Sequence, residues 1–293
     1  MKILFTIPHY YSGGRKGPHG SLGGDAAARV RAITTCLVSI HGTFGGRQGL
    51  IDSVARRIRR TNQEAAHEID VVVCTTGDEH LASGLEGLSY AFRHRPTNAE
   101  PKLLGYECHA ALQENLGNYD YYCYLEDDLE VKDPLFFVKL DWFRGWAGDD
   151  CVLQPNRFEA GLGAALTKYY HDGNLVDPAI SPRFQDRRDR PRLRAEALGR
   201  VFTFQRVDNP HAGCFFLSAG QMARWAEQPY FLDRASGFWG PLESAATLGV
   251  MRTFRVYKPS RECAGFLEVR HLGLRFLNRL PFGLDPPDPP DPA

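Results

Sequence analysis

The sequence predicts an α/β fold in which helices flank a mostly parallel sheet, and two observations point to it. Short apolar runs, typical of buried strands, alternate with stretches whose apolar residues recur every three or four positions. This alternation favours parallel pairing, because a parallel connection must cross a face of the sheet, usually as a helix. The 293 residues are 43% hydrophobic and 24% charged, proportions that suit a globular protein with a full core.

The first half supplies the predicted sheet. An apolar run over residues 2–7 predicts the first buried strand, and Asp25 is placed to cap the helix that follows. That helix has an apolar stripe formed by Val30, Ile33, Leu37 and Ile40. The remaining predictions are helices over residues 50–63, 79–85 and 102–116, and strands over residues 69–75, 90–93 and 119–125.

The second half is less regular. Its predicted strands cover residues 151–155, 201–206, 214–217 and 253–257, and its predicted helices cover residues 219–227 and 241–248. Residues 160–200 show little periodicity and many charges, which predicts an insertion or lid. The tail 285–293 repeats Asp-Pro-Pro and is predicted to be disordered or polyproline II, so that residues 1–284 form one domain.

Charge and cysteine content exclude several classes of protein. Thirty-five basic residues balance 35 acidic ones, which argues against a nucleic-acid partner. The seven cysteines lack CxxC spacing and lie mostly in apolar runs, so we expect reduced, buried thiols and no structural zinc. The sequence has neither a signal-peptide core nor an apolar stretch near the ~18 residues of a membrane span. A cytoplasmic location is expected, with docking at the inner face of a membrane left open.

The strongest chemical signal is an acidic cluster, Glu126-Asp127-Asp128, directly after the aromatic strand predicted over residues 119–125. Three adjacent carboxylates repel one another, and a bound Mg²⁺ or Mn²⁺ would relieve that repulsion. Ligands of open α/β sheets gather at the carboxyl ends of the strands. The alternative interpretation is a solvated acidic turn that caps a helix near Asp133.

The segment Tyr124-Leu125-Glu126-Asp127-Asp128 resembles the DxD-type metal-binding motif of GT-A fold glycosyltransferases. The resemblance implies a Rossmann-like sheet, a nucleotide-sugar-binding half over residues 1–130 and a variable acceptor-binding half over residues 131–284. It also implies that Asp128 binds the metal. Glu126 and Asp127 would contact the ribose or the metal. Because the motif reads Glu-Asp-Asp rather than a plain DxD, the resemblance does not assign them separate roles.

Further nucleotide contacts follow from the same resemblance. The loop after the first strand would surround the base and ribose, and the end of the second strand would contact the base. The residues implicated are Pro8, His9, Tyr10, Thr75, Asp78 and Lys102. A partly buried aromatic loop and an ordinary strand-to-helix turn are the alternatives for these two segments. Arg29 and Arg31 are placed to reach a diphosphate, although such residues are more often solvated.

The second half offers candidates for catalysis and for the acceptor. Glu243 lies at a helix start that resembles the position of the catalytic carboxylate in inverting members, although those often have two adjacent acids; the helix dipole alone would also favour an acid there. His271 is the candidate late histidine that completes the metal sphere. His211 and Trp239 are candidates for the acceptor pocket, with structural roles as the alternative.

Two arginine-rich segments remain. Residues 183–200 contain seven arginines and three acids, which would suit a lid over the diphosphate or a solvated loop. Residues 56–60 contain four arginines on a predicted helix, which indicates a solvated face or a membrane-surface contact.

The function predicted from the sequence is a metal-dependent, hexosyltransferase-like glycosyltransferase. It would use Mn²⁺ or Mg²⁺, a nucleoside-diphosphate sugar (UDP favoured) and a glycan or lipid-linked acceptor, with Glu243 as the base of an inverting reaction. A retaining mechanism stays open if Glu243 is not the base. The alternatives are a sugar-nucleotide-forming nucleotidyltransferase, for which Gly13-Gly14-Arg15-Lys16 is only a loose match, and a non-catalytic carbohydrate-binding or scaffold protein.

Overall fold

The computed structural model describes residues 1–14, 21–161, 166–175, 177–274 and 276–277. Its centre is a five-stranded sheet in the order β13-β6-β1-β4-β5. The strands are β1 (Lys2–Pro8), β4 (Glu68–Thr76), β5 (Arg93–Thr97), β6 (Tyr121–Leu125) and β13 (Cys214–Ser218). The first four pair in parallel, and β13 runs antiparallel to β6. The predicted α/β class and mostly parallel sheet are therefore confirmed.

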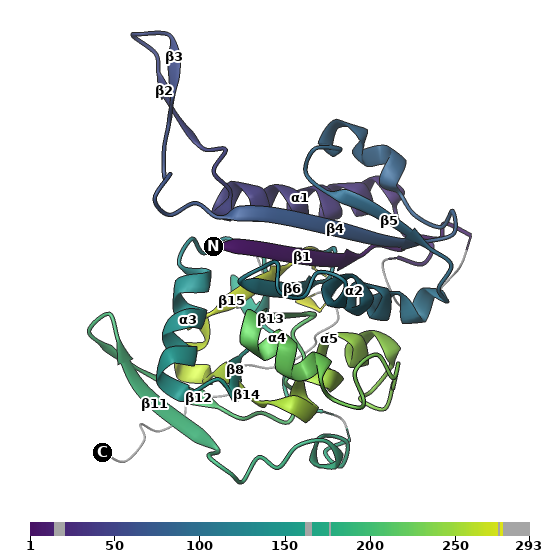
Figure 1. The fold of residues 1–293 in the computed structure, drawn as a ribbon, viewed down its shortest axis with the longest axis vertical. Coiled ribbons are helices and arrows are strands. Elements are labelled where there is room, and N and C mark those ends of the chain that lie inside the picture. The colour runs from purple at the N-terminus through teal and green to yellow at the C-terminus, as the bar shows by residue number, and fades with distance from the viewer. Residues whose placement is uncertain (15–20, 162–165, 176, 275, 278–293) are drawn as a thin grey trace.

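Helices cover both faces of this sheet (Figure 1). On one face, α1 (Ala26–Phe44) and α3 (Phe136–Ala147) pack against the side chains of Ile3, Phe5 and Ile7. On the other face, α2 (Leu104–Gln113), α4 (Ala219–Ala226) and α5 (Pro241–Thr253) pack against Leu4. Because successive side chains of β1 point to opposite faces, an uninterrupted apolar run is what this doubly covered strand requires. Asp25 caps α1 as predicted, accepting from the Ala27 N–H over 2.9 Å.

The second half adds two small mixed sheets. One has the order β10 (Lys168–Tyr170), β9 (Asn156–Ala160), β15 (Glu268–His271) and β7 (Leu129–Glu130). The other has the order β11 (Arg192–Ala197), β12 (Arg200–Gln205), β14 (Arg255–Pro259) and β8 (Cys151–Leu153). Short 3₁₀ segments cover Ala82–Leu88, Pro101–Leu103, Ser181–Arg183 and Arg261–Phe266.

The helix predicted over residues 50–63 is wrong. The segment forms a hairpin of β2 (Gly49–Asp52) and β3 (Arg57–Arg60). Leu50, Val54 and Ile58 have the four-residue spacing of a helix face, but all three are exposed. A helix here would therefore have no core to pack against. β-Branched residues and a turn in which Arg56 has φ 49° favour the hairpin instead.

Other elements differ from their predicted positions. The helix predicted over residues 79–85 is the 3₁₀ segment Ala82–Leu88, and the strand predicted over residues 90–93 is displaced to β5, Arg93–Thr97. Residues 160–200 contain β10 and β11, and β11 pairs with β12, so this segment is more regular than its lack of periodicity indicated. The predictions at residues 102–116, 119–125, 219–227 and 241–248 match α2, β6, α4 and α5 with small shifts. The tail 285–293 lies outside the described residues.

All seven cysteines lie in the described part of the chain, where each is a free thiol and only Cys263 is more than slightly accessible. The described residues contain no helix with the length and apolar character needed to cross a bilayer.

Candidate active site

The acidic cluster lies at the carboxyl end of the central sheet, beside the end of a neighbouring strand. Residues 126–128 follow β6, and His9 follows β1, which pairs with β6 in parallel. His9 Nδ1 and Asp127 Oδ2 are 2.6 Å apart, and both side chains are buried. Because the Leu81 N–H donates to His9 Nε2 over 3.1 Å, the other ring nitrogen carries the proton and donates to Asp127.

Arg29 of α1 forms ion pairs with the last two carboxylates of the cluster. Its guanidinium donates to Asp127 and, over 3.1 Å, to Asp128 Oδ2. Burial lowers the pKa of Arg29, but the charges of Asp127 and Asp128 outweigh it and raise the pKa above its ordinary value. The exposed fraction is 3% for the Asp127 side chain and 23% for that of Asp128. His9 and Arg29 therefore occupy the Asp127 carboxylate, whereas Asp128 keeps an accessible edge.

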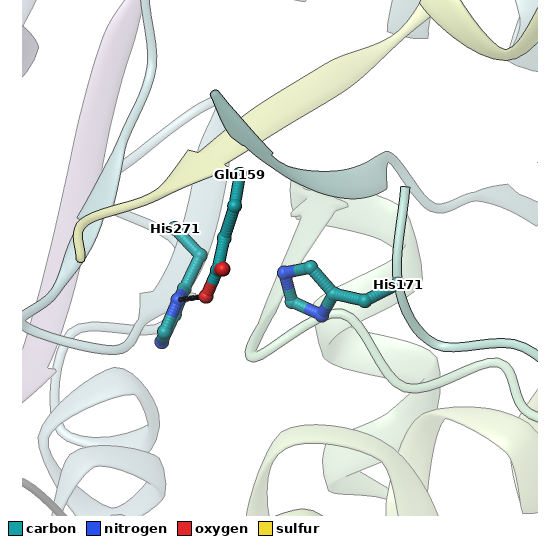
Figure 2. Close-up of side chains that lie close together, drawn as sticks. All are labelled: Glu159, His171 and His271. Atoms are coloured by element: carbon teal, nitrogen blue, oxygen red, sulfur yellow. Dashed lines mark hydrogen bonds and ion pairs between the residues drawn. The ribbon is translucent and has the colours of Figure 1, made fainter. Parts of the chain in front are cut away.

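The structure brings His271, the candidate late histidine, close to Asp128. Pairing of β15 with β7 places His271 opposite Leu129, and His271 Nε2 lies 3.7 Å from Asp128 Oδ2. The other ring nitrogen of His271 is 2.8 Å from Glu159 Oε1 (Figure 2). Although burial lowers the pKa of His271, the hydrogen bond to Glu159 and the charge of Asp128 raise it above its ordinary value.

Glu159 is fully buried on β9 and serves as an anchor. Besides its bond to His271, its carboxylate accepts from the backbone N–H groups of Phe276 and Leu277 over 3.1 and 2.8 Å. Burial raises its pKa, but these bonds outweigh that effect and lower the pKa below its ordinary value. Glu159 is therefore a charged group that fixes the orientation of the His271 ring.

His171 faces the same pair of side chains (Figure 2). Glu159, His171 and His271 each offer a ligand atom within 4.8 Å of the others. The His171 ring stacks on Phe276 at 4.3 Å, and only 9% of its side chain is exposed. Nδ1 of His171 lies 3.5 Å from Asp172 Oδ1, whereas Nε2 has no hydrogen-bond partner among the described residues. Two imidazoles and a carboxylate suit a divalent transition metal, and the unpartnered Nε2 of His171 fits such a use.

Glu126 belongs to a charged network that adjoins the Asp128 site. Arg157 of β9 reaches Glu126 Oε2 at 3.4 Å and donates to both oxygens of Asp172, the shorter bond being 2.6 Å. Burial raises the pKa of Glu126 to about 7, with further contributions from the charges of Asp128 and Glu243 against the opposing effect of Arg157. Lys258 Nζ lies 3.8 Å from Asp172 Oδ2, and burial lowers the pKa of Lys258.

The three candidates from the acceptor half lie in different surroundings. Glu243 is in the first turn of α5, partly exposed, and near enough to Glu126 for its charge to act there. Trp239 is 57% exposed and has φ 62°, a strained backbone for a bulky residue. His211 is buried, its Nδ1 lies 3.0 Å from Thr247 Oγ1, and burial lowers its pKa to about 3, so it is neutral.

The predicted nucleotide contacts surround the end of the sheet. Pro8 and Tyr10 flank His9 and are partly exposed, and the Tyr10 hydroxyl donates to Glu79 over 2.9 Å. Thr75 is buried and shares a 2.8 Å hydrogen bond with His94 Nε2. Asp78 and Lys102 are exposed, and Lys102 lies in the 3₁₀ segment that precedes α2.

Sequence reasoning missed Arg157, Glu159, His171 and Asp172. On β9 the alternation is reversed from the usual pattern, because the charged Arg157 and Glu159 point inward. A charged residue at every second position of a short strand is the signal that was available. His171 and Asp172 follow β10, in the segment without periodicity.

No protein-family model matches this chain, and no curated protein matches it. Among solved structures, it is similar to S. aureus TarS, with 10% identity, a TM-score of 0.46, and coverage of 95% of this chain and 38% of that one. It is also similar to S. aureus TarS 1-349 in complex with UDP, with 9% identity, a TM-score of 0.47 and coverage of 95% and 63%. A third similar structure is GalNAc-T7 with UDP, GalNAc and Mn²⁺, with 11% identity, a TM-score of 0.48, and coverage of 93% of this chain and 43% of that one. This chain thus spans less than two thirds of the length of each of these structures.

Proposed function

We propose that this chain is a metal-dependent glycosyltransferase that moves a sugar from a nucleoside-diphosphate sugar, with UDP the favoured nucleotide, to an acceptor hydroxyl. The observation that carries the proposal is the pairing of Asp128 with His271 at the carboxyl end of β6. Their facing atoms lie 3.7 Å apart, close to the roughly 3 Å that separates adjacent ligands of one divalent ion.

Asp128 and His271 would hold Mn²⁺ or Mg²⁺, and the imidazole ligand favours Mn²⁺. Glu159 supports this role by holding His271 through the opposite ring nitrogen, which leaves Nε2 directed at Asp128. The bound ion would neutralise charge on the two phosphates of the donor as they depart. His171 belongs to an overlapping donor set that shares His271, and its Nε2, which has no hydrogen-bond partner among the described residues, would be free to bind the cation.

The other residues of the cluster prepare the site. Asp127 fixes Arg29 and His9, and so sets the position of Asp128 through the adjoining backbone. Arg157 is held by Asp172 and directed at Glu126, so it offsets part of the negative charge beside the site where the diphosphate would bind. Pro8, Tyr10, Asp78 and Lys102 border this end of the sheet and would contact the nucleoside, with buried Thr75 supporting them.

Glu243 would act as the base. Its carboxylate would take the proton from the acceptor hydroxyl, whose oxygen forms a bond to the anomeric carbon while the carbon–oxygen bond to the diphosphate breaks. This displacement inverts the configuration at the anomeric carbon. Glu243 lies in the first turn of α5, where a negative charge interacts favourably with the helix dipole. Exposed Trp239 would stack on the sugar of a glycan or lipid-linked acceptor, and His211 would support that pocket from beneath.

Product analysis tests the proposal. The full chain is incubated with Mn²⁺ and a panel of UDP-, GDP- and TDP-sugars and candidate acceptors. The proposal predicts metal-dependent release of a nucleoside diphosphate, abolished in Asp128→Asn. Release of pyrophosphate from a nucleoside triphosphate and a sugar phosphate would instead establish nucleotidyl transfer. Metal-linked binding without turnover would establish a non-catalytic protein.

A further inference from the structure

The hairpin of β2 and β3, residues 49–60, lies apart from the rest of the molecule. Figure 1 shows it extending away from the central sheet and its helices. Every residue of β3 is exposed, as are three of the four in β2. The exposed fraction is 97% for Val54, 74% for Ile58, 72% for Ile51 and 60% for Leu50. Four large apolar side chains in twelve residues, all in water, indicate a surface made to be covered.

The hairpin is also strongly basic. Arg56, Arg57, Arg59 and Arg60 lie on β3 and its turn, and Asp52 is the only acid between residues 49 and 60. Asp52 lies 3.2 Å from Arg59 and 3.8 Å from Arg57, so it offsets part of this charge only. The complementary partner is therefore anionic as well as apolar.

The strand register shows how the apolar side chains are distributed. Ile51 pairs with Ile58 on one face, and Leu50 pairs with Arg59 on the other. Val54 lies in the turn. Apolar groups on both faces and at the tip suit a fluid medium that surrounds the hairpin, whereas one rigid protein surface would cover a single face.

A second copy of the chain fits less well. Strands of four residues offer little of the roughly 800 Å² that each partner buries in a stable interface. Symmetric pairing of β3 with β3 would also bring two runs of arginine together.

We propose that this hairpin binds an anionic lipid surface. Val54, Ile51 and Ile58 enter the headgroup region, and the arginines bind lipid phosphates. The hairpin precedes the amino end of β4, whereas the acidic cluster follows the carboxyl end of β6. Lipid binding is therefore independent of the proposed function, and either can fail without the other.

Co-sedimentation of the full chain with vesicles tests the proposal. The vesicles contain phosphatidylcholine, either pure or with about one third phosphatidylglycerol. Binding is expected only with phosphatidylglycerol and should weaken with salt. Arg56→Gln with Arg60→Gln should reduce binding by about fivefold for each charge removed. Val54→Ser with Ile58→Ser should also reduce it.

The matched control is Arg188→Gln with Arg261→Gln, two arginines whose side chains are 90% and 76% exposed elsewhere on the surface. This control should bind like the unmodified chain, and all variants should keep its melting temperature. Three results would overturn the proposal: no binding to phosphatidylglycerol, equal loss in hairpin and control variants, or a light-scattering dimer that only the hairpin variants abolish.

Discussion

Asp127 and Asp128 are neighbours in the chain with different surroundings. The Asp127 carboxylate is buried between His9 and Arg29, so both of its oxygens already have charged or N–H partners. Asp128 shares Arg29 but also faces His271 and solvent. The Asp127 carboxylate is therefore enclosed by the fold, whereas the Asp128 carboxylate keeps an accessible edge.

Matched substitutions separate these two roles. Asp127→Asn should lower the free energy of unfolding by about 2–4 kcal/mol, because it leaves partly buried Arg29 and buried His9 without their shared anion. Asp128→Asn should change stability less and abolish Mn²⁺ binding. Denaturant unfolding and metal titration of both variants check this prediction, and equal losses of stability would contradict it.

Glu243 is predicted to act on turnover rather than on donor binding. Glu243→Gln keeps the size of the side chain but removes its basicity, so kcat should fall by about 10²–10⁴-fold while donor affinity stays the same. Steady-state kinetics and donor titration measure the two quantities. An unchanged kcat in Glu243→Gln would show that Glu243 is not the base, and a retaining mechanism would then stay open.

His109 gives a prediction for pH. It is buried among aromatic rings, its Nε2 bonds to the Ala245 carbonyl at 2.9 Å, and burial lowers its pKa from 6.5 to about 4. Between these values the unfolded chain binds a proton that the folded protein does not, so stability is lost as the pH falls from 6.5 towards 4. The loss should reach up to about 3 kcal/mol. His109→Gln should flatten this part of the unfolding profile, and an unchanged slope would contradict the assignment.

At the scale of elements, the central strands were predictable because each is buried on both faces. The apolar runs of β1, β4 and β6 fit strands that are covered on both faces. Because the acidic cluster directly follows β6, it lies at the carboxyl end of the parallel strands. His271 and Asp128 could be proposed together only through the family resemblance, because a pairing of β15 with β7 across 140 residues leaves no local signal.

The unpredicted elements share a physical reason. In the hairpin, the spacing of Leu50, Val54 and Ile58 fits a helix as well as it fits two strands, and only the absence of a packing surface decides between them. On β9, Arg157 and Glu159 are buried because charged partners from distant segments surround them. The partners of a buried charge cannot be read from the strand that carries it.

Two glycines in helices test the packing of the second half. A Cβ on Gly249 of α5 would clash with the indole of Trp225 on α4, whereas one on exposed Gly145 of α3 would meet nothing within 4 Å. Gly249→Ala should destabilise the fold by about 1–3 kcal/mol, and Gly145→Ala should stabilise it by about 0.5–1 kcal/mol. Thermal unfolding gives the sign of each effect, and a stabilising Gly249→Ala would show that α4 and α5 do not pack as described.

At the scale of the whole molecule, the side chains of the candidate site come from elements that lie far apart in the sequence. The acidic cluster follows the central sheet, Arg29 comes from α1, Arg157 and Glu159 from β9, His271 from β15, and Glu243 from α5. A ligand bound there would stabilise several elements at once, so binding should raise the melting temperature of the chain as one unit.

The central claim is that Asp128 binds a nucleoside diphosphate through a divalent ion. Calorimetric titration of UDP, GDP and TDP into the full chain, with and without Mn²⁺, tests it most directly, with Asp128→Asn alongside. We expect at least one nucleotide to bind about tenfold or more tightly with Mn²⁺, and this gain to vanish in the variant. Binding of equal strength without the metal, or a metal effect that survives in Asp128→Asn, would contradict the account.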